Sequence, residues 1–154
     1  MDQPLAEVLD RLVFTAALPQ QVSAVLASMS KLERFSAGQV IFREGDATRI
    51  LYVVVSGRVM LEMQVPGRAP MRILSLGPGE MLAWSAVLNQ GGMTATARVV
   101  EDVEVVAICA GRLLEICEQN PQIGYALMRQ VAIALSERLV ATRLQLLNVF
   151  GEPH

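Results

Sequence analysis

The residue types that most often act as nucleophiles, proton-transfer groups and metal ligands are scarce in this sequence. Its 154 residues include one histidine, His154, and two cysteines, Cys109 and Cys117, which do not form a CxxC pair. This composition excludes serine–histidine and cysteine–histidine catalysis and any metal site that needs several histidines. We therefore expect a non-enzymatic protein without a metal site, whose two cysteines are reduced, buried thiols.

The charge balance of the chain disfavours nucleic acid and membranes as partners. Lysine and arginine number 13 and aspartate and glutamate 15, for a net charge of −2, and no basic run occurs. Hydrophobic residues make up 53% of the chain, yet no apolar run approaches the roughly 18 residues of a membrane helix. The N-terminal segment Met1-Asp2-Gln3-Pro4 lacks the features of a signal peptide. We expect a cytoplasmic domain with no nucleic-acid or membrane partner.

The spacing of apolar residues changes from a helical period to a strand period and back again. Helices are predicted over residues 5–14 and 19–29, and again over residues 111–118 and about 121–149. Segments bounded by Gly- and Pro-containing turns are predicted strands, over residues 39–43, 50–55, 58–65, 70–76, 94–100 and 103–109. This order predicts an α+β, mainly β, fold, in which a small barrel or sandwich lies between helices.

The long C-terminal helix carries apolar side chains at alternating spacings of four and three residues. Asn120 and Pro121 form its predicted start and Gly151 its stop. The seam consists of Met128, Ala132, Leu135, Leu139, Thr142, Leu146 and Val149. A heptad seam over about three repeats favours a parallel homodimer through this helix. The alternative is a helix that packs only against its own β-domain.

Two glycine-punctuated stretches make the architecture specific. Residues 35–46 (FSAGQVIFREGD) and 51–59 (LYVVVSGRV) place Gly38, Gly45 and Gly57 where tight turns require a positive φ. Together with Leu76-Gly77-Pro78-Gly79-Glu80-Met81-Leu82, they resemble the cyclic-nucleotide-binding domain family. This family includes the sensor half of catabolite activator regulators, protein kinase A regulatory subunits and gated channels.

The resemblance implies one domain over residues 1–154, built as a jelly-roll-like β-roll, or double-stranded β-helix. It implies N-terminal helices over residues 1–34, the β-roll over 35–109, and C-terminal helices over 110–150, the long one serving dimerisation. A phosphate-binding cassette is expected at residues 83–96 within the roll.

The cassette departs from the family pattern at both of its charged positions. The resemblance places Ala83 at the family glycine, Trp84 at the glutamate that binds the ribose, and Met93 at the arginine that binds the cyclic phosphate. Losing both contacts would remove about 3–5 kcal/mol of binding free energy. A weak anion site remains, formed by backbone N–H groups and two hydroxyls. The candidate ligand-binding residues are thus Ala83, Trp84, Ser85, Ala86, Met93, Thr94 and Ala95. In an alternative register, Glu80 would be the family glutamate.

A second part of the resemblance lies on the long helix. In dimeric regulators of this family, an arginine and a threonine one helical turn later reach the nucleotide base. Arg138 and Thr142 have this spacing, so the resemblance implies that they contact ligand or the dimer partner. The alternative is that Arg138 is a solvated charge and Thr142 a tolerated polar residue of the seam.

These features together predict a stand-alone regulatory sensor module, a homodimer that signals by movement of the cassette and the C-terminal helices. Cyclic AMP or cyclic GMP is the implied ligand, with a different small anion or nucleotide and an unidentified protein partner left open. One alternative is a degenerate dimerisation or docking domain that binds no nucleotide. Another is the sensor half of a transcription regulator, because no helix-turn-helix segment follows the long helix within these residues.

Overall fold

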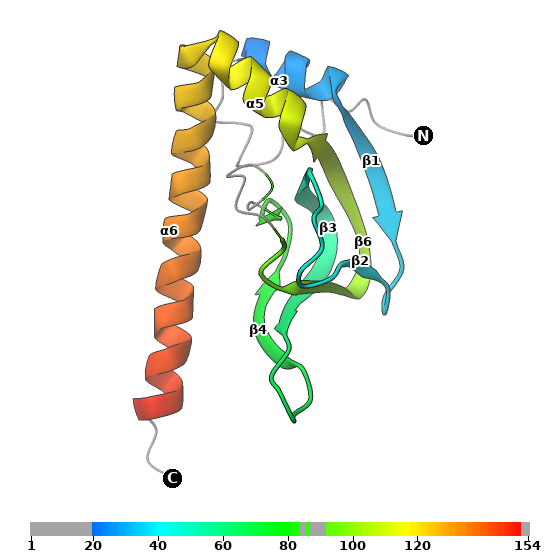
Figure 1. The fold of residues 1–154 in the computed structure, drawn as a ribbon, viewed down its shortest axis with the longest axis vertical. Coiled ribbons are helices and arrows are strands. Elements are labelled where there is room, and N and C mark those ends of the chain that lie inside the picture. The colour runs from blue at the N-terminus through cyan, green and yellow to red at the C-terminus, as the bar shows by residue number, and fades with distance from the viewer. Residues whose placement is uncertain (1–19, 84–85, 87–91, 152–154) are drawn as a thin grey trace.

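A β-roll with helices at one end and a long helix along one side makes up the fold (Figure 1). The computed structural model describes residues 20–83, 86 and 92–151. The helix predicted over residues 5–14 and half of the cassette predicted at residues 83–96 lie outside the described residues. The elements are α3 (Gln20–Ser28), β1 (Ser30–Phe35), β2 (Val40–Phe42), β3 (Ile50–Met63), β4 (Met71–Leu76), β5 (Met81–Leu82), β6 (Thr96–Cys109), α5 (Ala110–Gln119) and α6 (Pro121–Gly151).

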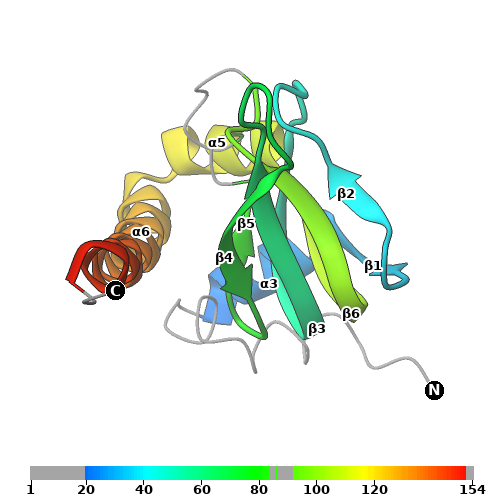
Figure 2. The ribbon, with the colours of Figure 1, turned by 90° about the horizontal axis from the view of Figure 1, so that it is seen from below.

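Two long strands form the centre of the sheet. The strands predicted over 50–55 and 58–65 are one strand, β3, and those predicted over 94–100 and 103–109 are one strand, β6. The two run antiparallel from Ile50 opposite Cys109 to Glu62 opposite Thr96, with register shifts near Ser56 and Arg58. Figure 2 shows the pair side by side. The turn signal at Ser56-Gly57 therefore marks an irregularity within a strand rather than its end.

Strand β1 corrects the sequence division, which assigned residues 1–34 to N-terminal helices. Residues 30–35 pair with β6 along their whole length, from Ser30 opposite Ile108 to Phe35 opposite Val103. Leu32 and Phe35 are three residues apart and therefore lie on opposite faces of the strand. The segment consequently lacks the alternation by which a strand is recognised. Strand β5 was also missed, because two residues are too few to show any period.

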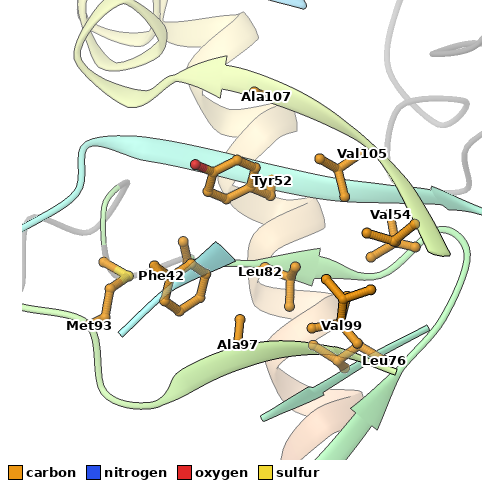
Figure 3. Packing of buried hydrophobic residues seen from close by; sticks show 13 residues of the cluster. Phe42, Tyr52, Val54, Leu76, Leu82, Met93, Ala97, Val99, Val105 and Ala107 are labelled. Atoms are coloured by element: carbon orange, nitrogen blue, oxygen red, sulfur yellow. The ribbon is translucent and has the colours of Figure 1, made fainter. Parts of the chain in front are cut away.

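The core consists of two apolar clusters separated by the β3–β6 sheet. Leu51 and Val53 of β3 pack with Leu113 of α5 and with Leu127 and Val131 of α6 in the first cluster. The alternate residues of β3, such as Tyr52 and Val54, point into the roll and belong to the second cluster. This cluster also includes Phe42, Val105 and Ala107 (Figure 3). Both faces of β3 are therefore buried from Leu51 to Val54, which explains the continuous apolar sequence of its first part.

Three glycines confirm the turn chemistry expected from the sequence. Gly38, Gly45 and Gly57 have φ values of 92°, 91° and 90°. These values lie in the region that residues with a Cβ rarely adopt.

The cysteines differ from the expectation of two buried thiols. Cys109 ends β6 with its side chain exposed, and Cys117 in α5 is partly buried. Burial, together with the neighbouring Glu118, raises the pKa of the Cys117 thiol. We expect a thiol reagent to label Cys109 first near pH 8, and labelling of Cys117 to speed up at higher pH, as its thiolate forms. Mass spectrometry of labelled peptides measures both rates, and faster labelling of Cys117 would contradict this assignment.

No helix within the described residues combines the length and apolar character needed to cross a membrane.

Candidate ligand site between the roll and helix α6

The candidate site begins where β5 leaves the sheet. Val54 N–H donates to the Glu80 carbonyl (2.9 Å), and the chain continues through Met81 and Leu82 to Ala83. Ala83 has φ of 65°, the one positive value at a non-glycine residue in the described part of the chain. A left-handed backbone at the position where the resemblance places a glycine is consistent with the predicted register.

The structure describes only some of the predicted cassette residues. Trp84 and Ser85 lie outside the described residues. Ala86 is half-buried and packs against both apolar clusters, and its N–H donates to the Ala83 carbonyl (3.0 Å). At the far end of the cassette, Met93 and Ala95 are buried and Thr94 is exposed.

At the position where the resemblance places an arginine, Met93 supplies an apolar side chain that is buried inside the roll. Its exposed fraction is 3%, and Figure 3 shows it directed toward Phe42. Its backbone is also engaged, because Met93 N–H donates to the Asp46 carbonyl (2.8 Å) and its carbonyl accepts from Gly45 N–H (2.8 Å). This backbone N–H is therefore not available to a ligand. The arginine that the family uses for the cyclic phosphate has no substitute at this position.

A small cavity lies at this end of the roll and is reached by one residue of α6. Its apolar lining comes from Phe42, Leu61, Met93 and Ala95, beside Ala83, and its polar lining from Thr94 and Arg138. The volume is about 20 Å³, which is room for about one water molecule. Five residues that sequence reasoning placed in the candidate site line this cavity together: Ala83, Met93, Thr94, Ala95 and Arg138. Sequence reasoning missed Phe42 and Leu61, for which strand alternation was the available signal.

Arg138 joins α6 to strand β5. One guanidinium N–H donates to the Met81 carbonyl, two residues before Ala83. Burial lowers the pKa of Arg138, whereas the nearby negative charge of Glu80 raises it. The alternative of a fully solvated Arg138 is therefore wrong, because the side chain spans the contact between helix and roll.

Thr142 and Glu80 use their polar atoms within the protein. The Thr142 hydroxyl donates to the Arg138 carbonyl (2.8 Å), a bond to its own helix. The Glu80 carboxylate accepts from Gly77 N–H (2.6 Å) and so ties together the turn before β5. Glu80 lies directly before β5. Arg98 of β6 is likewise engaged within the protein, because its guanidinium forms an ion pair with the Glu62 carboxylate (3.2 Å).

Two larger cavities continue along α6 from the small one. The first, of about 110 Å³, shares Arg138 with the small cavity and is also lined by Leu74, Glu80, Met81 and Glu137. The second, of about 200 Å³, shares Glu80, Met81 and Glu137 with the first. Small cavities therefore follow the contact between α6 and the turn before β5.

The predicted dimer seam divides into two groups. Met128 and Leu135 are half-buried against the first apolar cluster of their own chain. Ala132, Leu139 and Leu146 are exposed, and the Val149 side chain is outside the described part. The exposed large apolar residues of α6 beyond Val131 are Ile133, Leu139, Val140, Leu144, Leu146 and Leu147. Exposed apolar side chains therefore remain on α6 within the single chain.

The structure is thus a β-roll flanked by a long C-terminal helix, one residue of which reaches a small cavity of the roll. Comparison with known proteins gives the family. The family model of the cyclic nucleotide-binding domain matches residues 32–120. This chain belongs to the cyclic nucleotide-binding domain family.

Individual relatives agree with this assignment. The cyclic AMP receptor protein of Thermus thermophilus is 30% identical over 125 residues, which cover 81% of this chain and 57% of that protein. The chain thus spans little more than half the length of that relative. A crystal structure of a candidate cyclic nucleotide-binding protein from Geobacter metallireducens GS-15 is 31% identical, with a TM-score of 0.78, covering 90% of this chain and 99% of that one. Glutaminase 2 of Bradyrhizobium diazoefficiens is 27% identical over 139 residues, which are 21% of its length.

Proposed function

We propose that this chain is a regulatory sensor module that acts by binding a small ligand rather than by catalysis. Ligand binding at the cassette would change the contact between the roll and α6, a two-state packing change. The hydrogen bond from Arg138 to the Met81 carbonyl carries this proposal, because it connects the helix directly to the strand that precedes the cassette. A ligand that competes for Arg138 would therefore alter how α6 is held.

The proposal includes a homodimer through α6. Leu139 and Leu146 of the predicted seam are each more than half exposed in the single chain. A helix with apolar side chains on its outer face gains stability when a partner covers that face. A dimer would also make α6 the element that transmits a change at the roll to a second copy.

Cyclic AMP and cyclic GMP are the first ligands to test, because of the family and the receptor among its relatives. We expect binding weakened by about 10²-fold or more, because hydrogen bonds to charged groups contribute about 1.5–3 kcal/mol each and Met93 supplies none. Titration of the fluorescence of Trp84, the only tryptophan, measures it. Micromolar saturation that is lost in Thr94→Ala would show that our affinity argument is wrong.

A degenerate docking domain is the second candidate. The observation that favours it is the buried Met93 side chain beside a cavity of only about 20 Å³. A third reading is the sensor half of a transcription regulator. The length of the native open reading frame distinguishes that reading from a stand-alone module.

A further inference from the structure

We propose that Arg138 and Thr94 anchor the carboxylate of a small organic acid whose apolar body lies against the roll interior. This inference rests on the proposed sensor function and names the class of ligand. It replaces the cyclic phosphate by a carboxylate and the polar ribose by a hydrocarbon group.

The first support is a cation with few partners. The guanidinium of Arg138 has five N–H donors, and among the residues that the structure describes its one hydrogen bond goes to the Met81 carbonyl. No carboxylate of this part of the chain lies within ion-pair distance of it. A largely desolvated cation is stabilised by an anion, and the planar guanidinium matches a carboxylate in two parallel hydrogen bonds.

The second support is a free hydroxyl beside this cation. Thr94 lines the same cavity as Arg138, and its side chain makes no hydrogen bond within the described residues. A threonine hydroxyl can donate to a carboxylate oxygen. The two side chains come from opposite sides, Thr94 from the segment before β6 and Arg138 from α6. A bound carboxylate would therefore connect the roll to the helix.

The apolar lining fixes the rest of the ligand. Phe42, Leu61 and Met93 surround the two polar groups, and Met93 stands where a second cation would be needed for a phosphate. A polar ribose would lose hydrogen bonds to water in such surroundings without replacing them. A hydrocarbon group would instead gain from contact with these side chains.

Arg138 also decides how much space a ligand can use. It lines both the cavity of about 20 Å³ and the neighbouring cavity of about 110 Å³. Rotation of its side chain away from the Met81 carbonyl would join the two spaces. Together the two spaces are about 130 Å³, close to but below the about 150 Å³ of a cavity that holds benzene, so they suit a small monocarboxylate.

Nearby negative charge favours a monoanion over a dianion. Glu80 and Glu137 both line the cavity of about 110 Å³ beside Arg138. Their repulsion increases with the charge on the ligand and opposes a phosphomonoester dianion more than a carboxylate. The two carboxylates beside Arg138 therefore oppose a singly charged acid less than a dianion.

Isothermal titration of the whole chain with benzoate and 3-methylbutanoate tests this assignment. The probes for charge are the neutral amides, benzamide and 3-methylbutanamide, which keep the same hydrocarbon bodies. We expect at least one acid to bind, and its amide to bind at least about tenfold more weakly. This preference should disappear in Arg138→Gln and weaken in Thr94→Val.

Arg143→Gln is the matched control, because Arg143 is an exposed arginine on the same helix. It should leave the preference unchanged. A thermal melt confirms that each variant is folded, and Thr94→Val keeps the test decisive if Arg138→Gln does not fold. Equal binding of acid and amide, no binding of either acid, or a preference that persists in Arg138→Gln would overturn the assignment.

Parallel titrations with cyclic AMP and cyclic GMP separate the two proposals. Binding of a cyclic nucleotide without binding of either acid would overturn the carboxylate assignment and support the sensor function. If no acid and no nucleotide binds folded protein, both proposals fail and the docking domain remains.

Discussion

Replacing Gly57 by alanine is expected to destabilise the protein by about 2–5 kcal/mol, a large part of the 5–15 kcal/mol typical of a domain. Gly57 has φ of 90°, and a Cβ built on it would lie 2.2 Å from the Asp102 carbonyl oxygen and 2.8 Å from the Val103 Cα. The left-handed conformation costs an L-residue about 1–2 kcal/mol. Overpacking against the facing backbone adds typically 1–3 kcal/mol.

The facing backbone has little freedom to retreat from the new methyl group. Asp102 and Val103 belong to β6, and the Asp102 carboxylate accepts a hydrogen bond from Ala37 N–H (2.8 Å). Moving this segment away would disturb the register shift at which β3 and β6 meet. Chemical denaturation followed by circular dichroism measures the loss in free energy of unfolding. In a thermal melt we expect Tm to fall by roughly 10 °C.

Gly38→Ala is the matched control for this variant. Gly38 has nearly the same φ, 92°, but nothing lies within 4 Å of a Cβ built on it. We expect only the conformational cost, about 1–2 kcal/mol. Equal losses in the two variants would show that the close approach of β3 and β6 at Gly57 contributes nothing.

The same glycines explain which parts of the fold could be predicted from the sequence. A positive φ is a local requirement, so the backbone conformation at Gly38, Gly45 and Gly57 could be predicted from the sequence alone. Whether a turn at such a glycine ends a strand is not decided locally, because it depends on how the neighbouring strands pair. Ser56-Gly57 resembled the end of a strand, but the pairing of β3 with β6 on both sides continues the strand through it. Strand β1 was not predicted for the same reason, since its conformation is imposed by pairing with β6.

The candidate site was predictable in its chemistry but not in its geometry. The types of Met93 and Thr94 follow directly from the chain, as does the absence of an arginine at position 93. Whether Arg138 faces the roll depends on how α6 is rotated about its axis, which packing of Leu127 and Val131 against the first cluster decides. The same rotation decides which seam residues remain for a partner. It buries one side of Met128 and Leu135 within the chain and leaves the outer face open.

Leu139→Glu is expected to raise the dissociation constant of the proposed homodimer by about 10²-fold or more. In a parallel dimer of α6, Leu139 would face its own copy, so the variant would bring two carboxylates together in an apolar interface. Like charges in such contact cost several kcal/mol. Leu139 is 53% exposed in the single chain, so the fold of each copy should persist. Analytical ultracentrifugation measures the dissociation constant, and circular dichroism checks the fold.

Val140→Glu is the matched control, and it distinguishes two stripes on α6. Val140 is 51% exposed and adjacent in sequence, but it points about 100° away around the helix. It belongs with Ile133, Leu144 and Leu147, whereas Leu139 belongs with Ala132 and Leu146 of the predicted seam. Dissociation by Leu139→Glu alone supports the predicted seam. Dissociation by Val140→Glu alone would place the interface on the other stripe, and a monomeric wild-type protein would contradict the dimer itself.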